Sequence, residues 1–159
     1  MKKLKLYLDT SVISHLKQDD TPDKMTDTLN LWRDIEHGKF EIYLSEVTLD
    51  EIGRCTEEKL SVLSRHLKSI DYTLLSGSDE IVRVANQIIN LGILTQKSFD
   101  DCLHIAHAVV YGCDCIVSWN FKHMVNIKTI KGVRAITNLG NYGSVDIVAP
   151  PTLLESEVE

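Results

Sequence analysis

Short hydrophobic runs alternate along the chain with longer amphipathic stretches. In residues 3–9, KLKLYLD, leucine at every second position alternates with lysine and tyrosine, which is the period of a β-strand. Similar short runs fall near residues 40–44, 71–75, 114–118 and 145–148. The segments between them space their apolar residues three and four apart, as amphipathic helices do. Strands alternating with helices predict a three-layer α/β/α fold with a central parallel sheet of about five strands.

Polar residues gather where the predicted strands end. Asp9 closes the first strand, and Thr10 and Ser11 are candidate caps for the helix that follows. A later helix, predicted over 46–55, carries Glu51 on the same face as apolar residues. In a parallel sheet, helices begin at the edge where strands finish, so both carboxylates are expected at that edge. An ion pair or a partly exposed edge position would also explain Glu51.

The stretch 98–124 has the densest polar pattern. Ser98 is a candidate helix cap, and two aspartates follow in the first turn, where carboxylates interact favourably with the helix dipole. At about 100° per residue, Asp101 falls on the apolar face, which is costly for a carboxylate without a partner. The remaining polar positions form a stripe predicted to face solvent, namely Asp100, His104, His107 and Tyr111. A capping box between Ser98 and Asp101 would also explain the spacing.

Four polar side chains are expected to converge at the carboxyl edge of the sheet: Asp9, Glu51, Asp101 and Asn120, which follows the fourth strand. Three carboxylates that meet without evident basic partners repel one another unless a cation is present. Oxygen ligands of this kind suit Mg²⁺ or Mn²⁺. Such ions can activate water against a phosphodiester, so the pattern favours phosphodiester hydrolysis.

Composition narrows the partners of such a site. The 159 residues are 43% hydrophobic and 25% charged, as in soluble globular proteins, and the formal charge of −6 argues against a broad basic face for nucleic acid. Four cysteines without metal-ligand spacing are expected to be buried thiols. We expect one domain over residues 1–150, a short acidic tail over 151–159, no membrane segment and a cytoplasmic location.

Four motifs resemble, in order, those of PIN-domain proteins of the VapC type: LDTSVIS, SEVTLDEIGR, DDCLHIAHAVVYGCD and IVSWNFKH. The resemblance implies a PIN fold and an endoribonuclease that requires Mg²⁺ or Mn²⁺ and cuts single-stranded or structured RNA. It also implies the toxin of a type II toxin-antitoxin pair, with a cognate antitoxin protein as partner and a homodimer as the assembly. Asp9, Glu51 and Asp101 match the family's acidic positions, whereas the fourth, frequently an aspartate, is Asn120 here.

This match assigns roles to the candidate residues. Asp9 and Asp101 are expected to bind the first ion, Glu51 to orient or deprotonate water, and Asn120 to support the site through its side-chain oxygen. Supporting or RNA-binding roles are expected for four further residues, Thr10, Ser11, Lys122 and His123.

Three aspects of this hypothesis stay open. An amide brings no negative charge, so Asn120 puts a second ion in doubt and leaves an alternative: a catalytically weak PIN-like module that binds RNA or a protein without cleavage. Trp119 and Phe121 beside it can stack on bases, although at least one is expected in the core. A basic segment follows the site and either holds RNA backbone or is an ordinary solvated face, with Lys122, Lys128, Lys131 and Arg134.

Overall fold

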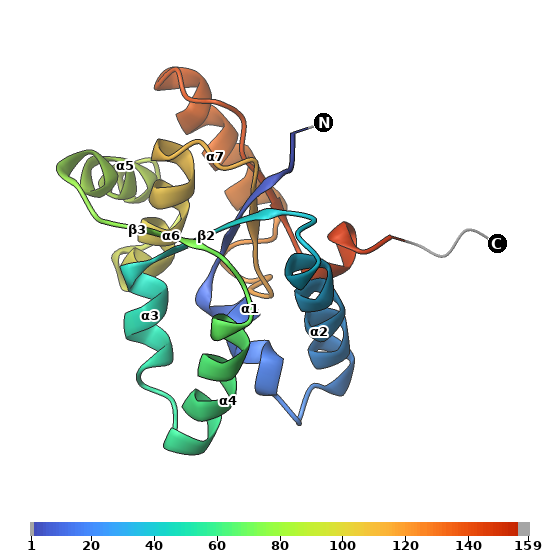
Figure 1. Cartoon of the computed structure of the whole chain (residues 1–159). Helices are drawn as coiled ribbons and strands as arrows, with labels where there is room; N and C mark the ends of the chain where they lie inside the picture. The colour runs from blue at the N-terminus through green and yellow to red at the C-terminus, as the bar shows by residue number, and fades with distance from the viewer. Residues whose placement is uncertain (1, 156–159) are drawn as a thin grey trace.

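One five-stranded sheet forms the centre of the structure, a computed structural model that describes residues 2–155 (Figure 1). The strands are β1 (Lys5–Leu8), β2 (Glu41–Ser45), β3 (Thr73–Leu75), β4 (Cys115–Val117) and β5 (Asp146–Val148). They run in the order β3-β2-β1-β4-β5, and every neighbouring pair is parallel. The predicted parallel sheet is confirmed, and each strand falls within two residues of its expected position.

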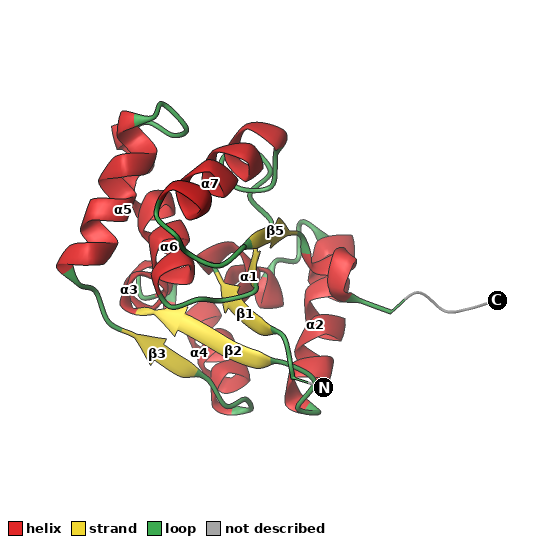
Figure 2. Ribbon diagram, turned by 90° about the horizontal axis from the view of Figure 1, so that it is seen from above, coloured by secondary structure: helices red, strands yellow, loops and turns green. Residues whose placement is uncertain are grey.

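Helices cover both faces of this sheet, which confirms the three-layer arrangement (Figure 2). They are α1 (Thr10–Ser14), α2 (Pro22–Glu36), α3 (Glu46–Ile52), α4 (Glu57–Lys68), α5 (Asp79–Asn90), α6 (Phe99–Val110) and α7 (Ile127–Leu139). Three short 3-10 turns join them, η1 (His15–Lys17), η2 (Gln96–Ser98) and η3 (Pro150–Leu153). Within residues 2–155, none of the helices combines the length and apolar character that crossing a bilayer requires.

Two hydrophobic cores lie on opposite faces of the sheet, and alternate residues of β1 contribute to each of them. Leu6 and Leu8 point into the layer formed with α1, α2 and α4, whereas Tyr7 points into the layer of α5, α6 and α7. All three side chains are fully buried because β1 is the central strand, paired with β2 on one side and β4 on the other. The central strand therefore brings its carboxyl end, with Asp9, into the middle of the sheet edge.

The helix caps differ in part from the prediction. Asp9, not Thr10 or Ser11, caps α1, because its side chain accepts the Val12 N–H. Neither Ser98 before α6 nor Ser45 before α3 caps its helix through its side chain. The capping box that would have explained Asp101 is therefore not formed.

The segment after β5 packs partly onto the hydrophobic core that contains residues of α2. Leu153 and Leu154, inside the range 151–159 expected to be an acidic tail, contact the layer that contains α2. Glu155 pairs with Lys39 at 3.0 Å. Residues 156–159 of that tail lie outside the described residues.

Candidate active site

A pocket of about 390 Å³ opens at the carboxyl edge of the sheet, where β1 and β4 end and α1 begins. Its lining residues come from four separate parts of the chain: Asp9, Thr10, Ser11, Ser14, His15, Gln18, Glu51, Asp101, His104 and Asn120. The structure thus brings together all four residues for which a catalytic role was predicted. Those roles stay predictions, whereas the shared location is observed.

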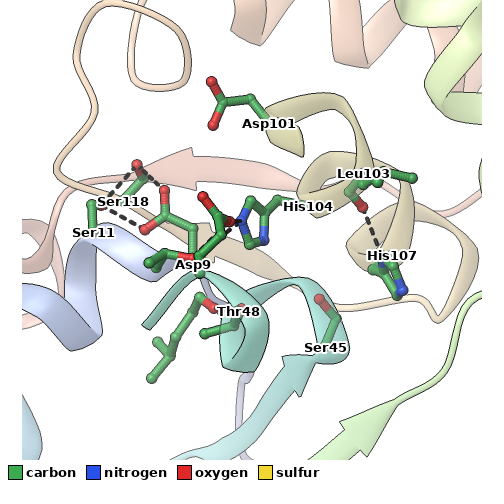
Figure 3. Close-up of polar contacts among 12 residues, drawn as sticks. Asp9, Ser11, Ser45, Thr48, Asp101, Leu103, His104, His107 and Ser118 are labelled. Carbon is green, nitrogen blue, oxygen red and sulfur yellow. Dashed lines mark hydrogen bonds and ion pairs between the residues drawn. The ribbon is translucent and has the colours of Figure 1, made fainter. Parts of the chain in front are cut away.

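Asp9 is buried, and its carboxylate is enclosed by hydroxyl groups (Figure 3). Ser11 Oγ donates to Oδ1 at 2.6 Å, the Val12 N–H donates to the same oxygen at 3.3 Å, and Ser118 Oγ donates to Oδ2. Burial raises the pKa of Asp9, although these bonds oppose that shift. Asp9 is therefore a carboxylate whose charge is costly and whose orientation is fixed on two sides.

Ser118 is a site residue that the sequence reasoning missed. It is fully buried at the end of β4, and its Oγ accepts the Asn120 N–H at 2.9 Å while donating to Asp9. The signal was present in the sequence, because a polar residue directly after a buried strand next to β1 must lie beside Asp9.

Glu51 ends a buried chain of hydrogen bonds that runs into the sheet. Its Oε1 accepts from Thr10 Oγ1 at 2.9 Å and lies 2.6 Å from His104 Nε2. On the other side of the same ring, His104 Nδ1 lies 2.6 Å from Tyr7 Oη, which lies 2.7 Å from Ser45 Oγ. A hydroxyl can donate or accept, so Tyr7 satisfies Nδ1 whether or not it carries a proton, and Nε2–H donates to Glu51 in both states.

The pair of Glu51 and His104 is electrostatically coupled. Burial opposes charge on both groups, but their mutual hydrogen bond and attraction prevail, lowering the pKa of Glu51 and raising that of His104. The nearby charges of Asp9 and Asp101 also raise the pKa of His104. The expectation that the carboxylates meet without a basic partner is therefore wrong.

The prediction that the histidines of α6 face solvent is wrong as well. His104 is only 1% exposed and His107 only 3%, while Asp100 is exposed as predicted. His107 Nδ1 bonds to the Leu103 carbonyl at 2.7 Å, and its ring stacks on Tyr7 at 6.4 Å between centroids. A helix covered by the sheet on one side and by α3 and α5 on others leaves these histidines buried.

Asp101 faces the pocket from the first turn of α6 and is paired with a histidine. Its Oδ2 lies 2.9 Å from His123 Nδ1. The backbone N–H of His123 donates to Asn120 Oδ1 at 2.9 Å. The Asn120 oxygen that was predicted to support the site therefore already closes a local turn. Lys122 and His123 do not line this pocket but a neighbouring one of about 210 Å³, together with Lys128.

Carboxylate and amide oxygens are the donors that Mg²⁺ and Mn²⁺ prefer, so the chemistry of the pocket fits such an ion. The positions of the side chains do not form a complete metal site. Within residues 2–155, no three Asp, Glu, His or Cys side chains lie close enough together to hold a metal ion. Asp9, Glu51 and Asp101 are each engaged with a hydroxyl or a histidine instead. Holding an ion therefore requires these carboxylates to exchange some of those contacts.

Comparison with known proteins agrees with this fold. A chain of the crystal structure of VapBC2 from Rickettsia felis, bound to a DNA fragment from its promoter, is similar with a TM-score of 0.56 and 16% sequence identity. The similarity covers 75% of this chain and 90% of that chain. No curated protein matches the sequence. A family model described as PIN domain matches residues 5–122, most of the chain, and the protein therefore belongs to the PIN domain family.

Proposed function

We propose that this protein is a metal-dependent endoribonuclease that hydrolyses phosphodiester bonds at the pocket of Asp9, Glu51, Asp101 and Asn120. The observation that carries the proposal is the convergence of three carboxylates from separate elements on one pocket, one of them buried at a cost. A carboxylate whose pKa is perturbed by burial and that lies in a cleft is a candidate functional residue. Membership of the PIN domain family adds support, because nuclease activity is what that resemblance implies.

In the proposed site, Asp9 and Asp101 would hold Mg²⁺ or Mn²⁺, and the amide oxygen of Asn120 would support the ion. A bound ion supplies positive charge for the phosphate and leaving oxygen and makes water more acidic. Ser11 and Ser118 keep Asp9 in place.

Glu51 is the proposed base. Its two contacts, with Thr10 and His104, are both made by Oε1, so Oε2 is the oxygen proposed to accept a proton from the attacking water.

Cleavage of a mixed single-stranded RNA pool tests this proposal. Purified protein should cut the RNA in Mg²⁺ or Mn²⁺ and stop cutting when chelator is added. The Asp101→Asn variant should be less active than the wild type by about 10²-fold or more. Asp100→Asn is the matched control, because Asp100 is the exposed neighbour on the same helical turn and should be silent. Equal activity of the two variants, or full activity in chelator, would overturn the assignment.

A second function, binding without cleavage, is favoured by two observations. Asn120 stands at a position where an acid is frequent in the family, and Glu51 Oε1 is already hydrogen-bonded to His104. Calorimetry with Mn²⁺ separates the two functions: the nuclease should bind the ion and lose that binding as Asp9→Asn, whereas a non-cutting module should show no heat of binding. RNA binding without Mn²⁺ binding or cutting would establish the second function.

A protein partner is part of the proposal. The structurally similar VapBC2 of Rickettsia felis is associated with a promoter, and by this likeness we propose that the protein is the toxin of a toxin-antitoxin pair, expected as a homodimer. Expression of the chain alone should arrest growth, and co-expression of the protein encoded beside it should relieve the arrest. Light scattering of the purified protein measures the assembly.

A further inference from the structure

The two aromatic residues that flank Asn120 have different environments. Trp119 is only 7% exposed, and its Nε1 donates to Thr28 Oγ1 at 2.8 Å, so it is part of the core. Phe121 is 48% exposed although it directly follows Asn120, which lines the acidic pocket. Leaving a phenylalanine half in water forgoes the stabilisation that burial provides. Of these two aromatic side chains, Phe121 is therefore the one that is available to a ligand.

Phe121 is held in place and continues a row of rings that leaves the pocket. Its ring packs edge-on against Trp119 at 6.3 Å, and Trp119 lies 5.8 Å from the ring of His15, which lines the pocket. The backbone is fixed as well, because Asn126 Nδ2 donates to the Phe121 carbonyl at 3.0 Å. A ring that is held by a neighbouring ring and a fixed backbone presents its exposed surface without a large loss of entropy on binding.

A lysine of α2 lies over these two aromatic rings. Lys24 of α2 places its Nζ 5.5 Å from the centre of the Phe121 ring and 5.6 Å from that of Trp119. Within residues 2–155, Lys24 forms no ion pair with a carboxylate. Its charge also reaches the pocket, since it contributes to lowering the pKa of His15, after burial. In a chain of net charge −6, this is a local cation beside an aromatic surface.

We propose that Phe121 and Lys24 form a subsite for one nucleotide of a single strand, with the base stacked on Phe121 and the adjoining phosphate bound by Lys24. Only an unpaired, splayed base offers a face to an aromatic ring, since bases inside a duplex are stacked on their neighbours. The subsite makes the strand continue from the pocket over Phe121, so the substrate class is single-stranded nucleic acid. This inference deepens the proposed function and rests on it for the identity of the pocket.

Binding without cleavage tests the subsite separately from catalysis. A fluorescent single-stranded RNA of about twelve nucleotides is titrated with protein in chelator, and its anisotropy gives Kd. Phe121→Ala should weaken binding by about fivefold or more, the effect of losing one stacked base, whereas Phe121→Trp should preserve it. Leu91→Ala is the matched control, because Leu91 is 51% exposed and lies after α5, outside the residues that line the pocket.

Three further measurements identify which contact is made. Lys24→Ala should flatten the dependence of log Kd on log salt by about 0.7, the share of one phosphate on a single strand, while the exposed Lys68→Ala should not. An abasic site moved along the RNA should weaken wild-type binding at one position and have no effect there on Phe121→Ala. A duplex of the same sequence should bind more weakly than the single strand.

The outcomes separate this inference from the proposed nuclease. Strand binding that depends on Phe121 without any cutting supports the subsite and overturns the nuclease. If the wild type cuts RNA and the Phe121→Ala variant binds the strand as tightly as the wild type, the subsite is overturned and the nuclease proposal remains. Absence of strand binding by the wild type overturns the subsite, and a protein partner then becomes the better occupant of Phe121.

Discussion

Replacing Tyr7 by phenylalanine tests the buried chain of hydrogen bonds that ends at Glu51. The substitution keeps the ring and removes only Oη, which lies 2.6 Å from His104 Nδ1 and 2.7 Å from Ser45 Oγ. Both partners are buried, so the change leaves at least His104 Nδ1 without a hydrogen-bond partner. An orphaned buried polar group costs about 1–3 kcal/mol. Since ~1 kcal/mol lowers Tm by about 2–4 °C in a domain of this size, a cost of ~2 kcal/mol predicts a fall of about 4–8 °C.

Thermal melts followed by circular dichroism at neutral pH measure this change, and urea titration gives the free energy of unfolding. Tyr43→Phe is the control, because the Tyr43 hydroxyl makes only a long bond of 3.4 Å to Glu41 and should be worth less than about 0.5 kcal/mol. If the nuclease proposal holds, Tyr7→Phe should also lower kcat more than it raises KM, since it loosens the residue that holds Glu51. Equal Tm values for Tyr7→Phe, Tyr43→Phe and wild type would refute the hydrogen-bonded chain.

Three further predictions concern charge and packing. Because burial raises the pKa of Asp9, its charged form opposes folding above the usual pKa of aspartate. Asp9→Asn should therefore raise Tm at neutral pH, and a lower Tm would contradict this. The raised pKa of His104 and lowered pKa of Glu51 make their pairing complete between about pH 4.3 and about pH 6.5, and stability is lost as pH rises through the folded pKa of His104 or falls through that of Glu51. The Tm difference between wild type and Glu51→Gln should therefore shrink outside that window, and a constant difference would exclude the ion pair. Gly132→Ala should cost about 1–3 kcal/mol in urea titration despite the better helix propensity of alanine, because the added Cβ would lie 2.5 Å from Ile93 Cδ1.

The fold was predictable because its signals are local. Alternation in KLKLYLD and the short apolar runs located the strands, and Pro22 and Gly38 bounded α2 as expected, Gly38 with a φ of +78° that suits glycine. The placement of Asp9, Glu51, Asp101 and Asn120 at one edge also needed only the rule that parallel strands end together. Their chemical roles need experiments, since location does not measure reactivity.

The environment of His104 was not predictable from helical periodicity. A helical wheel assumes that one face of a helix meets water, and it assigned His104 and His107 to that face beside Asp100. α6 instead lies between the sheet and neighbouring helices, so these polar side chains must find partners inside the protein. One partner of His104 is Tyr7, 97 positions earlier in the chain, and no local pattern encodes such a pair.

The central position of β1 determines when the site can form during synthesis. Asp9 is synthesised before its partner, because the Ser118 hydroxyl that holds it lies 109 residues later in the chain, and His104 lies 53 residues after Glu51. At translation rates of about 5–20 residues per second, the gap of 109 residues corresponds to about 5–20 s. A nascent or truncated chain that ends before β4 has no second neighbour for β1 and no assembled pocket. Any activity at this pocket is thus delayed until the chain has been synthesised through β4 and Ser118.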